Sequence, residues 1–410
     1  MTARNGGSGA TAGRTGDEAC DEHHGGGVLI IAPRGCRFSA AAATSIDLHI
    51  AEIARTSRHA TRITVAAPTV ADPFPGIRHI AWDPKLRGGA RDRALATIAH
   101  AEAPALIVVH QHLGTAAGLA RLLTGRRADI GPPPVALVRH NYVKPPRTGF
   151  LTALSTRLQA HRFGRLAGLG FVSAPLLDAF RTDWHARLGG SLPLFLSPNG
   201  IDTELWAPGE KRDRLLFTGR LAPEKGVLEA AEATARLLTD HPGWDAVFVL
   251  DSRGASPDYA ATVRAALAPA GARAEIRENI PHDAVRALAA ESAIAFVPTQ
   301  AAEPFGRVAL EAMAAGAVVV ASAAGGLGPL VEGAGITLPR PDAAALVAAA
   351  DPLMADAAAR LHLAAAGRAR AETWNLAAAG HAFDTMADEL TAPFSGIIDT
   401  GRHKTRSHFM

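Results

Sequence analysis

The feature that most constrains the fold is a regular alternation of short apolar runs with longer amphipathic segments. The apolar runs have strand length, as in "VLIIAP", and segments such as "ATSIDLHIAEIARTS" between them have helical spacing. This alternation is typical of βαβ units, so it predicts a parallel sheet with helices on both faces. In the first half of the chain the runs are residues 28–33, 62–68, 105–110, 135–140 and 169–173.

The alternation pauses at "LPLFLSPNGIDTELWAPGEKRD" (192–213), which is rich in turn residues, and then starts again. A chain of 410 residues is long for one ordinary core. We therefore predict two doubly wound, Rossmann-like α/β domains that face a central cleft. The second set of strand-like runs is residues 214–219, 246–250, 274–278, 293–298, 317–322 and 335–339.

Composition excludes several classes of protein. The net charge of +3 gives no reason to expect a nucleic-acid partner. Two cysteines, Cys20 and Cys36, make no disulfide framework, so a reducing cytoplasm fits best. The uncharged run 312–331 is mostly Ala and Gly and contains Pro329, so a buried strand explains it better than a membrane span.

Two cations follow the first strand of the second domain, in "FTGRLAPEKGV" (217–227). Arg220 and Lys225 lie in the loop to the next helix, and Gly219 and Gly226 allow close approach of the backbone. Such a group suits a diphosphate, and the alternative is a solvated turn. Only five of the 42 basic residues are lysines, which favours a specific role for this one.

The segment "AAEPFGRVALEAMAAG" (301–316) combines an anion site with two carboxylates. Gly306 can begin a helix, whose free N–H groups would face the cleft and bind an anion. Glu303 precedes this helix and Glu311 lies within it, where each can accept hydrogen bonds from hydroxyl groups. A nucleotide-sugar has this pattern of groups. Taken singly, Glu303 reads better as a loop charge and Glu311 as a surface helix charge, and it is the presence of Arg220 and Lys225 that favours a site.

Three stretches together resemble the successive signatures of glycosyltransferase family 4, retaining enzymes of the GT-B fold. They are "SPNGIDTELWAP", "FTGRLAPEKGV" and "EPFGRVALEAMAAGAVVVASAAGGLGPLVEG". The resemblance implies that Arg220 and Lys225 bind the donor diphosphate. It also implies that Glu303 contacts the transferred sugar and Glu311 the ribose. The residues implied to surround the diphosphate and the sugar are Phe305, Gly306, Arg307 and Val308, with Gly219 beside the donor.

The first domain resembles the family more loosely. "APRGCRFSAAAATSIDLHIAEIA" matches the loop after the first strand, where Gly35 would let the backbone approach a phosphate. His140, in "ALVRHNYV", corresponds to the family's active-site histidine near the sugar. For His110 and His112 we expect packing or hydrogen-bonding roles.

These patterns divide the chain into five parts. Residues 1–26 are expected to be a disordered leader without the apolar core of a signal peptide. The resemblance makes 27–207 the acceptor-side domain, 208–372 the nucleotide-sugar-binding domain, and 373–395, which includes Trp374, a helix returning to the first domain. Residues 396–410 are expected to be a flexible tail.

The resulting expectation is a metal-independent, cytoplasmic hexosyltransferase. No Asp-x-Asp occurs in the sequence, so Arg220, Lys225 and the helix N-terminus would offset the charge of the leaving diphosphate. We expect no cofactor and no metal, a nucleotide-sugar as co-substrate, and a saccharide or lipid-linked acceptor in cell-surface polysaccharide or glycolipid synthesis. Two alternatives are a sugar-nucleotide epimerase of the same fold and a non-catalytic GT-B scaffold subunit.

One basic segment suggests a membrane surface. No acidic residue occurs between Asp129 and Asp178, and residues 150–167 read as a basic amphipathic helix. Such a helix can bind peripherally to an anionic membrane, here at its inner face. The alternative is an ordinary surface helix in an arginine-rich protein.

Overall fold

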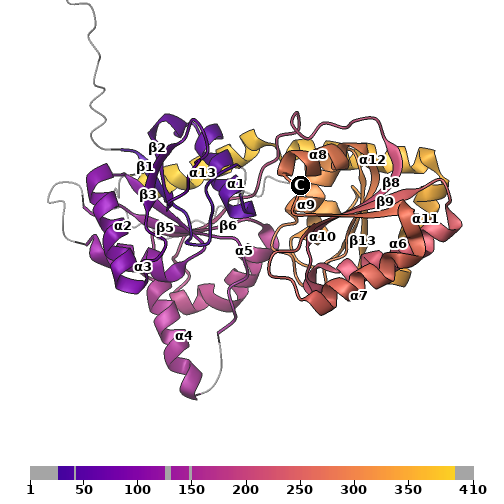
Figure 1. Cartoon of the computed structure of the whole chain (residues 1–410). Helices are drawn as coiled ribbons and strands as arrows, with labels where there is room; N and C mark the ends of the chain where they lie inside the picture. The colour runs from indigo at the N-terminus through magenta and orange to yellow at the C-terminus, as the bar shows by residue number, and fades with distance from the viewer. Residues whose placement is uncertain (1–25, 41–42, 125–130, 147–149, 393–410) are drawn as a thin grey trace, which may run out of the picture.

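The computed structural model describes residues 26–40, 43–124, 131–146 and 150–392. It forms two α/β units that lie side by side (Figure 1). The predicted tail 396–410 and all but the last residue of the predicted leader lie outside the described residues.

The first unit is built on a parallel sheet with the order β3-β2-β1-β4-β5-β6-β7. All five apolar runs predicted here form strands. The sequence did not predict β3, which is only partly buried, or β7, which is three residues long and lies in the turn-rich segment. The strands are β1 (Val28–Ile31), β2 (Ile63–Pro68), β3 (Arg78–Trp82), β4 (Leu106–His110), β5 (Val135–Arg139), β6 (Gly168–Phe171) and β7 (Leu194–Leu196).

The second unit repeats this plan with the parallel order β10-β9-β8-β11-β12-β13. Its strands coincide with the six predicted runs. They are β8 (Arg212–Arg220), β9 (Asp245–Asp251), β10 (Ala274–Glu278), β11 (Ser292–Val297), β12 (Val318–Ser322) and β13 (Ile336–Leu338). The run predicted not to span a membrane contains β12, whose five residues are all buried.

Helices cover both faces of each sheet. Those in the first unit are α1 (Ser45–Thr56), α2 (Gly88–Glu102), α3 (Leu113–Leu122), α4 (Phe150–Phe163) and α5 (Ala174–Phe180). Those that follow are α6 (Val227–Asp240), α7 (Pro257–Leu267), α8 (His282–Glu291), α9 (Arg307–Ala314), α10 (Leu327–Val331), α11 (Ala343–Ala355), α12 (Ala357–Thr373) and α13 (Leu376–Thr391). Short 3₁₀ or π turns occupy Ala60–Arg62, Arg181–His185, Ala186–Leu188, Pro223–Lys225 and Ala268–Arg273. No helix in the described part of the chain is long and apolar enough to cross a membrane.

The Ala-rich segment 342–372 is helical and forms two helices, α11 and α12. The break lies at Asp356, which is extended, with φ −114° and ψ 101°. Its carboxylate accepts hydrogen bonds from the backbone N–H groups of Ala358 and Ala359, at 2.9 and 3.0 Å. An aspartate in this position caps a new helix, so it separates α11 from α12.

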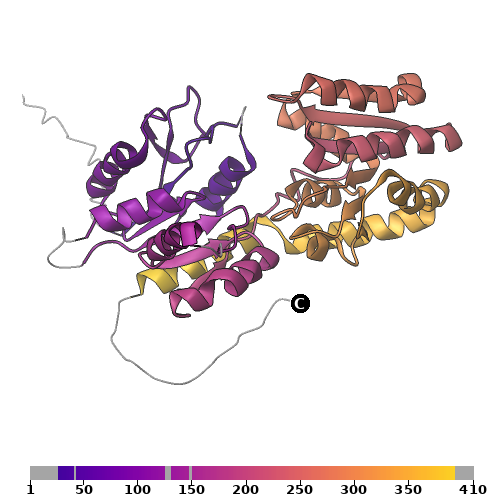
Figure 2. The same cartoon turned by 90° about the horizontal axis from the view of Figure 1, so that it is seen from below.

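The last helix, α13, returns to the first unit as expected (Figure 2). Phe383, Met386 and Leu390 join the core formed by β1 and α1. Asp384 accepts hydrogen bonds from the Ser57 hydroxyl, at 2.5 Å, and from the Arg58 backbone N–H, at 3.0 Å. The expectation that Trp374 belongs to this helix is wrong: it is the C-cap of α12, two residues before α13 begins.

Candidate functional site

The carboxyl ends of the two sheets face each other, and residues just after these strands make contacts between the units. The Ser173 hydroxyl, which follows β6, donates a hydrogen bond to the Pro304 carbonyl, which follows β11. Tyr142 follows β5, and its hydroxyl would lie 2.9 Å from a Cβ atom added at Gly325. Burial and then the Glu303 carboxylate raise the pKa of Tyr142. Open α/β sheets bind ligands at this edge, so these contacts lie where a ligand is expected.

Lys225 is placed by a tight turn that leads from β8 to α6. Gly226 has φ +69°, and a Cβ atom there would overlap the carbonyl oxygen of Pro298, at the end of β11. The turn is also tied to the next strand, because the Gln300 N–H and the Thr299 hydroxyl both donate to the Glu224 carbonyl at 2.9 Å. Only glycine fits this combination of positive φ and close approach. The turn therefore places Lys225, which follows β8, beside the segment that follows β11.

Lys225 and Glu303 meet in this position. The Lys225 Nζ lies 2.6 Å from Glu303 Oε2, and their side chains are 27% and 21% exposed. The backbone of Glu303 is fixed in turn, since its carbonyl accepts a hydrogen bond from the Gly326 N–H at 2.7 Å. A charge-assisted hydrogen bond of this length is among the stronger polar contacts in proteins. Two residues that the sequence assigned to diphosphate and sugar are therefore in direct contact.

The helix α9 starts at Gly306 beside this pair. Gly306 has φ +107°, and an added Cβ atom would lie 2.7 Å from Leu327 Cδ1, so the start requires glycine. Within the described residues, no side chain caps this helix end. Its first N–H groups are thus left without a side-chain partner, and such groups can bind an anion.

Arg307 and Glu311 lie one turn apart on α9 and are almost completely buried. Arg307 Nε donates to Glu311 Oε1 at 3.0 Å, and its Nη1 donates to Glu52 Oε2 of α1, also at 3.0 Å. Burial alone would lower the pKa of Arg307, but the two carboxylates raise it above its ordinary value. The ion pair of Arg307 with Glu52 therefore links the second unit to the first. The sequence did not predict this contact.

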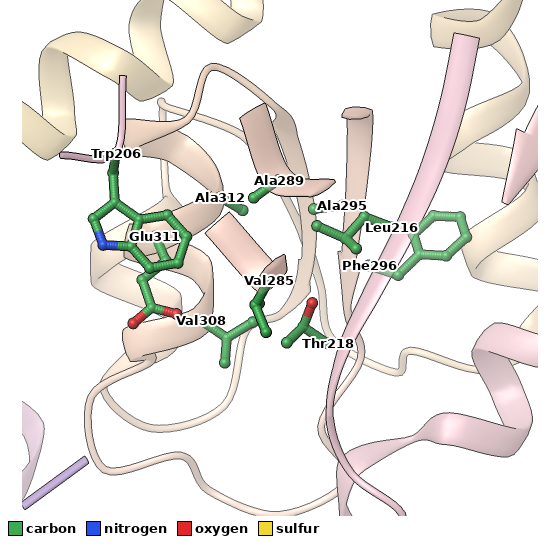
Figure 3. Close-up of a pocket in the computed structure, with 10 residues that line it drawn as sticks. All are labelled: Trp206, Leu216, Thr218, Val285, Ala289, Ala295, Phe296, Val308, Glu311 and Ala312. Carbon is green, nitrogen blue, oxygen red and sulfur yellow. The ribbon is translucent and has the colours of Figure 1, made fainter. Parts of the chain in front are cut away.

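A small cavity of about 10 Å³ borders the Glu311 carboxylate (Figure 3). This is room for about one water molecule. Trp206, Thr218 and Val308 also line it, and the buried Thr218 hydroxyl has no hydrogen-bond partner in the described residues. An unpartnered buried hydroxyl is costly unless something binds it. Thr218 and Trp206 are site candidates that the sequence analysis missed, although both lie in stretches that carry the family resemblance.

The remaining predicted donor residues lie close by. Arg220, at the end of β8, is 59% exposed and pairs with Glu224 at 2.9 Å. Gly219 precedes it in the same strand. The Phe305 ring is buried and packs edge-on against Trp374, with the ring centroids 5.3 Å apart. Its side chain therefore belongs to the core, and its backbone is the part nearest the start of α9.

Three buried histidines form a cluster in the first unit. His110 Nδ1 and His140 Nε2 are 2.8 Å apart, and the His49 ring of α1 packs edge-on against His140. His110 thus has the hydrogen-bonding role that was expected. His112 has one too, since its Nδ1 accepts the Thr115 N–H at 3.0 Å. Burial is the main cause that lowers the pKa of His110 to about 3 and the pKa values of His49 and His140 well below their ordinary range. All three are therefore neutral near pH 7.

This cluster is also the group that could hold a metal within the described residues. Its ligand nitrogens lie within 4.8 Å of one another. The sequence spacing gave no sign of it, because His49 comes from the middle of an amphipathic helix. Arg307 adds positive charge near His49 and contributes to lowering its pKa. That charge disfavours a cation, so these residues suit hydrogen bonding better than metal binding.

Gly35 lies on a much larger cavity, of about 460 Å³, at the carboxyl ends of β1 and β4. A Cβ atom added at Gly35 would meet nothing within 4 Å. His110 also lines this cavity, so it adjoins the histidine cluster. This cavity in the first unit therefore lies next to His110, which contacts His140.

Comparison with known proteins identifies the family and the fold. Residues 203–370 match the family model described as glycosyl transferases group 1. A glycogen synthase of Mycobacterium tuberculosis (strain H37Rv) is 36% identical over 180 residues, which is 42% of this chain and 42% of that protein. The chain thus spans less than half the length of these glycogen synthases in that alignment.

A longer match is to the alpha-maltose-1-phosphate synthase of the same strain, 30% identical over 322 residues, 71% of this chain and 78% of that protein. Among solved structures, sucrose-phosphate synthase from Thermosynechococcus elongatus has a TM-score of 0.68 at 19% identity, covering 89% of this chain and 99% of that one. Anabaena HepE in complex with UDP-glucose has a TM-score of 0.68 at 19% identity, covering 88% and 99%. These two likenesses establish the GT-B fold. The family model and the long alignment together show that the chain belongs to the group 1 glycosyltransferases.

Proposed function

We propose that the protein transfers a sugar from a nucleotide-diphosphate sugar to a hydroxyl acceptor, with retention of anomeric configuration and without a metal. The observation that carries this proposal is the contact of Lys225 with Glu303 beside the uncapped start of α9. It puts a cation, a carboxylate and an anion-binding helix end together at one point of the cleft. A solved neighbour, Anabaena HepE, binds UDP and UDP-glucose, which supports a nucleotide-sugar as the donor.

In this proposal each group meets one part of the donor. Arg220, Lys225 and the N–H groups of α9 bind the diphosphate. Once Lys225 turns to the diphosphate, the Glu303 carboxylate is free to accept hydrogen bonds from the sugar. Glu311 accepts hydrogen bonds from the ribose, and it is held for this by Arg307.

The transfer forms a bond between the acceptor oxygen and the anomeric carbon and breaks the bond from that carbon to the diphosphate. The proton of the acceptor hydroxyl passes to the leaving diphosphate on the same face of the sugar. Negative charge grows on the diphosphate as its bond breaks. Once the donor is bound and Lys225 has turned to the diphosphate, these positive groups stabilise that charge without further reorganisation. A neutral His140 can share a hydrogen bond with a sugar hydroxyl from the opposite unit.

The test is a panel of UDP-, GDP-, ADP- and TDP-sugars, assayed for donor hydrolysis and transfer, with Lys225→Ala beside the wild type. Loss of the Lys225 ammonium, which donates hydrogen bonds to the leaving diphosphate, should lower kcat by about 10²–10³-fold. Arg212→Ala is the matched control, because Arg212 is exposed at the opposite end of β8. Near wild-type activity of Lys225→Ala with every active donor would refute the diphosphate role.

Two further readouts test the finer parts. Excess EDTA should leave kcat unchanged, and loss of activity that Mg²⁺ restores would contradict metal independence. NMR of the product should show the anomeric configuration of the donor. An inverted product would contradict retention.

We also propose that α4 contacts an anionic membrane surface, the place where cell-surface polysaccharides or glycolipids are made. It projects from the first unit (Figure 1), and Leu154 and Leu158 are 75% and 48% exposed on either side of the exposed Arg157. Exposed apolar side chains next to basic ones suit an anionic surface. Sedimentation with anionic vesicles at low salt should be reduced in Leu154→Glu. Equal sedimentation of both proteins, or none of either, would remove this proposal.

A further inference from the structure

The cavity of about 460 Å³ in the first unit has an unusual charge. Three arginines line it and no acidic residue of the described chain does. Its size is within the roughly 300–1,000 Å³ of small-molecule pockets. The residues that line it are Ile31, Ala32, Pro33, Arg34, Gly35, Trp82, Arg87, Gly88, Arg91, Leu95, Val109, His110, His112 and Thr115.

Arg91 is held rigidly at this cavity. Its Nε and Nη2 donate to Asp92 Oδ1 at 3.1 and 2.9 Å, and both side chains are 11% exposed. Asp92 is itself packed against α3, since an added Cβ atom at Gly118 would lie 2.8 Å from the Asp92 carboxyl carbon. A guanidinium fixed in this way loses little entropy when it binds an oxyanion.

Arg34 supplies a second cation, and its guanidinium is unpaired in the described residues. It follows β1, is exposed, and has no hydrogen-bond or ion-pair partner in the part of the chain that the structure describes. Arg87 precedes α2 as its N-cap, and no side chain of the described residues caps this helix. Gly88, the first residue of α2, lines the cavity as well. The α2 N-terminus thus adds N–H groups and a partial positive charge to those of the arginines.

Two polar atoms of the lining are buried and have no hydrogen-bond partner among the described residues. They are Trp82 Nε1 and His110 Nε2, in residues that are 5% and 0% exposed. Buried polar groups are nearly always hydrogen-bonded, so such atoms call for a partner. A hydroxylated ligand beside the Trp82 indole and the His110 imidazole would provide it. An anion alone would use the arginines and leave these two atoms unpaired.

We infer that this cavity binds the acceptor and that the acceptor is a small sugar or polyol carrying a phosphomonoester. The inference rests on the proposed function and adds the chemical class of the second substrate. The dianionic phosphate meets Arg34, Arg91 and the start of α2, while hydroxyl groups meet Trp82 and His110. The phosphate anchors the acceptor and takes no part in bond formation. A separate hydroxyl of the acceptor is the nucleophile, on the side of the cavity where His110 contacts His140.

The test measures binding first, so that it does not depend on activity. Calorimetry with the full-length protein compares glucose 6-phosphate, inositol 1-phosphate, glucose, glucuronate and inorganic phosphate. We expect at least one of the two phosphorylated compounds to bind and glucose to bind at least 30-fold more weakly. Arg34→Gln should weaken that binding about 10-fold or more, as expected for a lost charge-assisted hydrogen bond.

Arg93→Gln is the matched control. Arg93 lies on α2, as Arg91 does, but it is exposed and does not line the cavity. It should bind as the wild type does. Arg91→Gln tests the buried cation, with circular dichroism to check that it is folded. Glucuronate bound as tightly as the phosphorylated compounds would refute the phosphomonoester, and inorganic phosphate bound as tightly would refute a sugar or polyol ligand.

Donor binding separates failure of this inference from failure of the proposed function. If a nucleotide-sugar binds and Lys225→Ala abolishes its hydrolysis, but neither phosphorylated compound binds, the inference is wrong and the function stands. If no nucleotide-sugar of the panel binds, the proposed function is wrong and the inference falls with it. If both bind, the phosphorylated compound should also accept the sugar, and its failure to do so would overturn its role as acceptor.

Discussion

Lowering the pH from 7 to 5 should destabilise the protein through its buried histidines. Burial lowers the pKa of His110 to about 3, compared with 6.5 for an ordinary histidine. Between these values the unfolded chain binds a proton at this residue and the folded chain does not. His110 therefore does not affect the free energy of unfolding above pH 6.5, and it lowers that free energy progressively as the pH falls from 6.5 toward 3.

The size of the effect follows from the same two values. Each pH unit below 6.5 costs about 1.4 kcal/mol, so His110 alone should cost about 2 kcal/mol between pH 7 and pH 5. His49 and His140 act in the same direction, because burial lowers their pKa values too.

Urea denaturation followed by tryptophan fluorescence at both pH values measures the loss. In His110→Asn, which has no titrating ring, the loss should be smaller by about 2 kcal/mol. Carboxylates that also titrate over this range are common to both proteins, so they cancel in the comparison. His100→Asn, at an exposed position on α2, should lose as much as the wild type. An equal loss in His110→Asn and the wild type would refute a neutral, buried His110.

Two further substitutions test the geometry of the cleft. Gly226→Ala should lower the free energy of unfolding by about 1–3 kcal/mol or more, because of its positive φ and the overlap with Pro298, whereas Gly243→Ala, with open space around the added methyl, should change it little; equal melting temperatures of the two variants would contradict this. Glu52→Gln should cost about 1–3 kcal/mol, because Arg307 keeps only one of its two carboxylate partners, and an unchanged urea midpoint would show that the contact between the units contributes nothing.

The sequence predicted the strands well where both faces are buried. Such strands are continuous runs of Val, Ile, Leu and Ala, and β4 and β12 are examples. It missed β3, whose "RHIAW" has two exposed and two half-buried positions and so lacks such a run. It also missed β7, which is too short to show any period. Tertiary pairing to β2 and to β6 decides both.

For the site, the sequence predicted that Lys225 and Glu303 follow strands, but it did not predict that they contact each other. Lys225 and Glu303 both follow strands, so both were expected at the cleft edge. Their contact depends on a turn at Gly226 that only the fold makes necessary. His49 was missed for a similar reason: it lies in the middle of a helix, and its place beside β4 and β5 follows from how α1 packs.

The return of α13 to the first unit has a consequence for synthesis of the chain. The contact of Ser57 with Asp384 joins residues 327 positions apart, and Phe383 and Met386 fill the core under β1. The first unit cannot close this core until α13 has left the ribosome. The second unit, complete by the end of α12, can fold before that point. Until α13 emerges, the first unit would expose an apolar face, which is the kind of surface that chaperones bind.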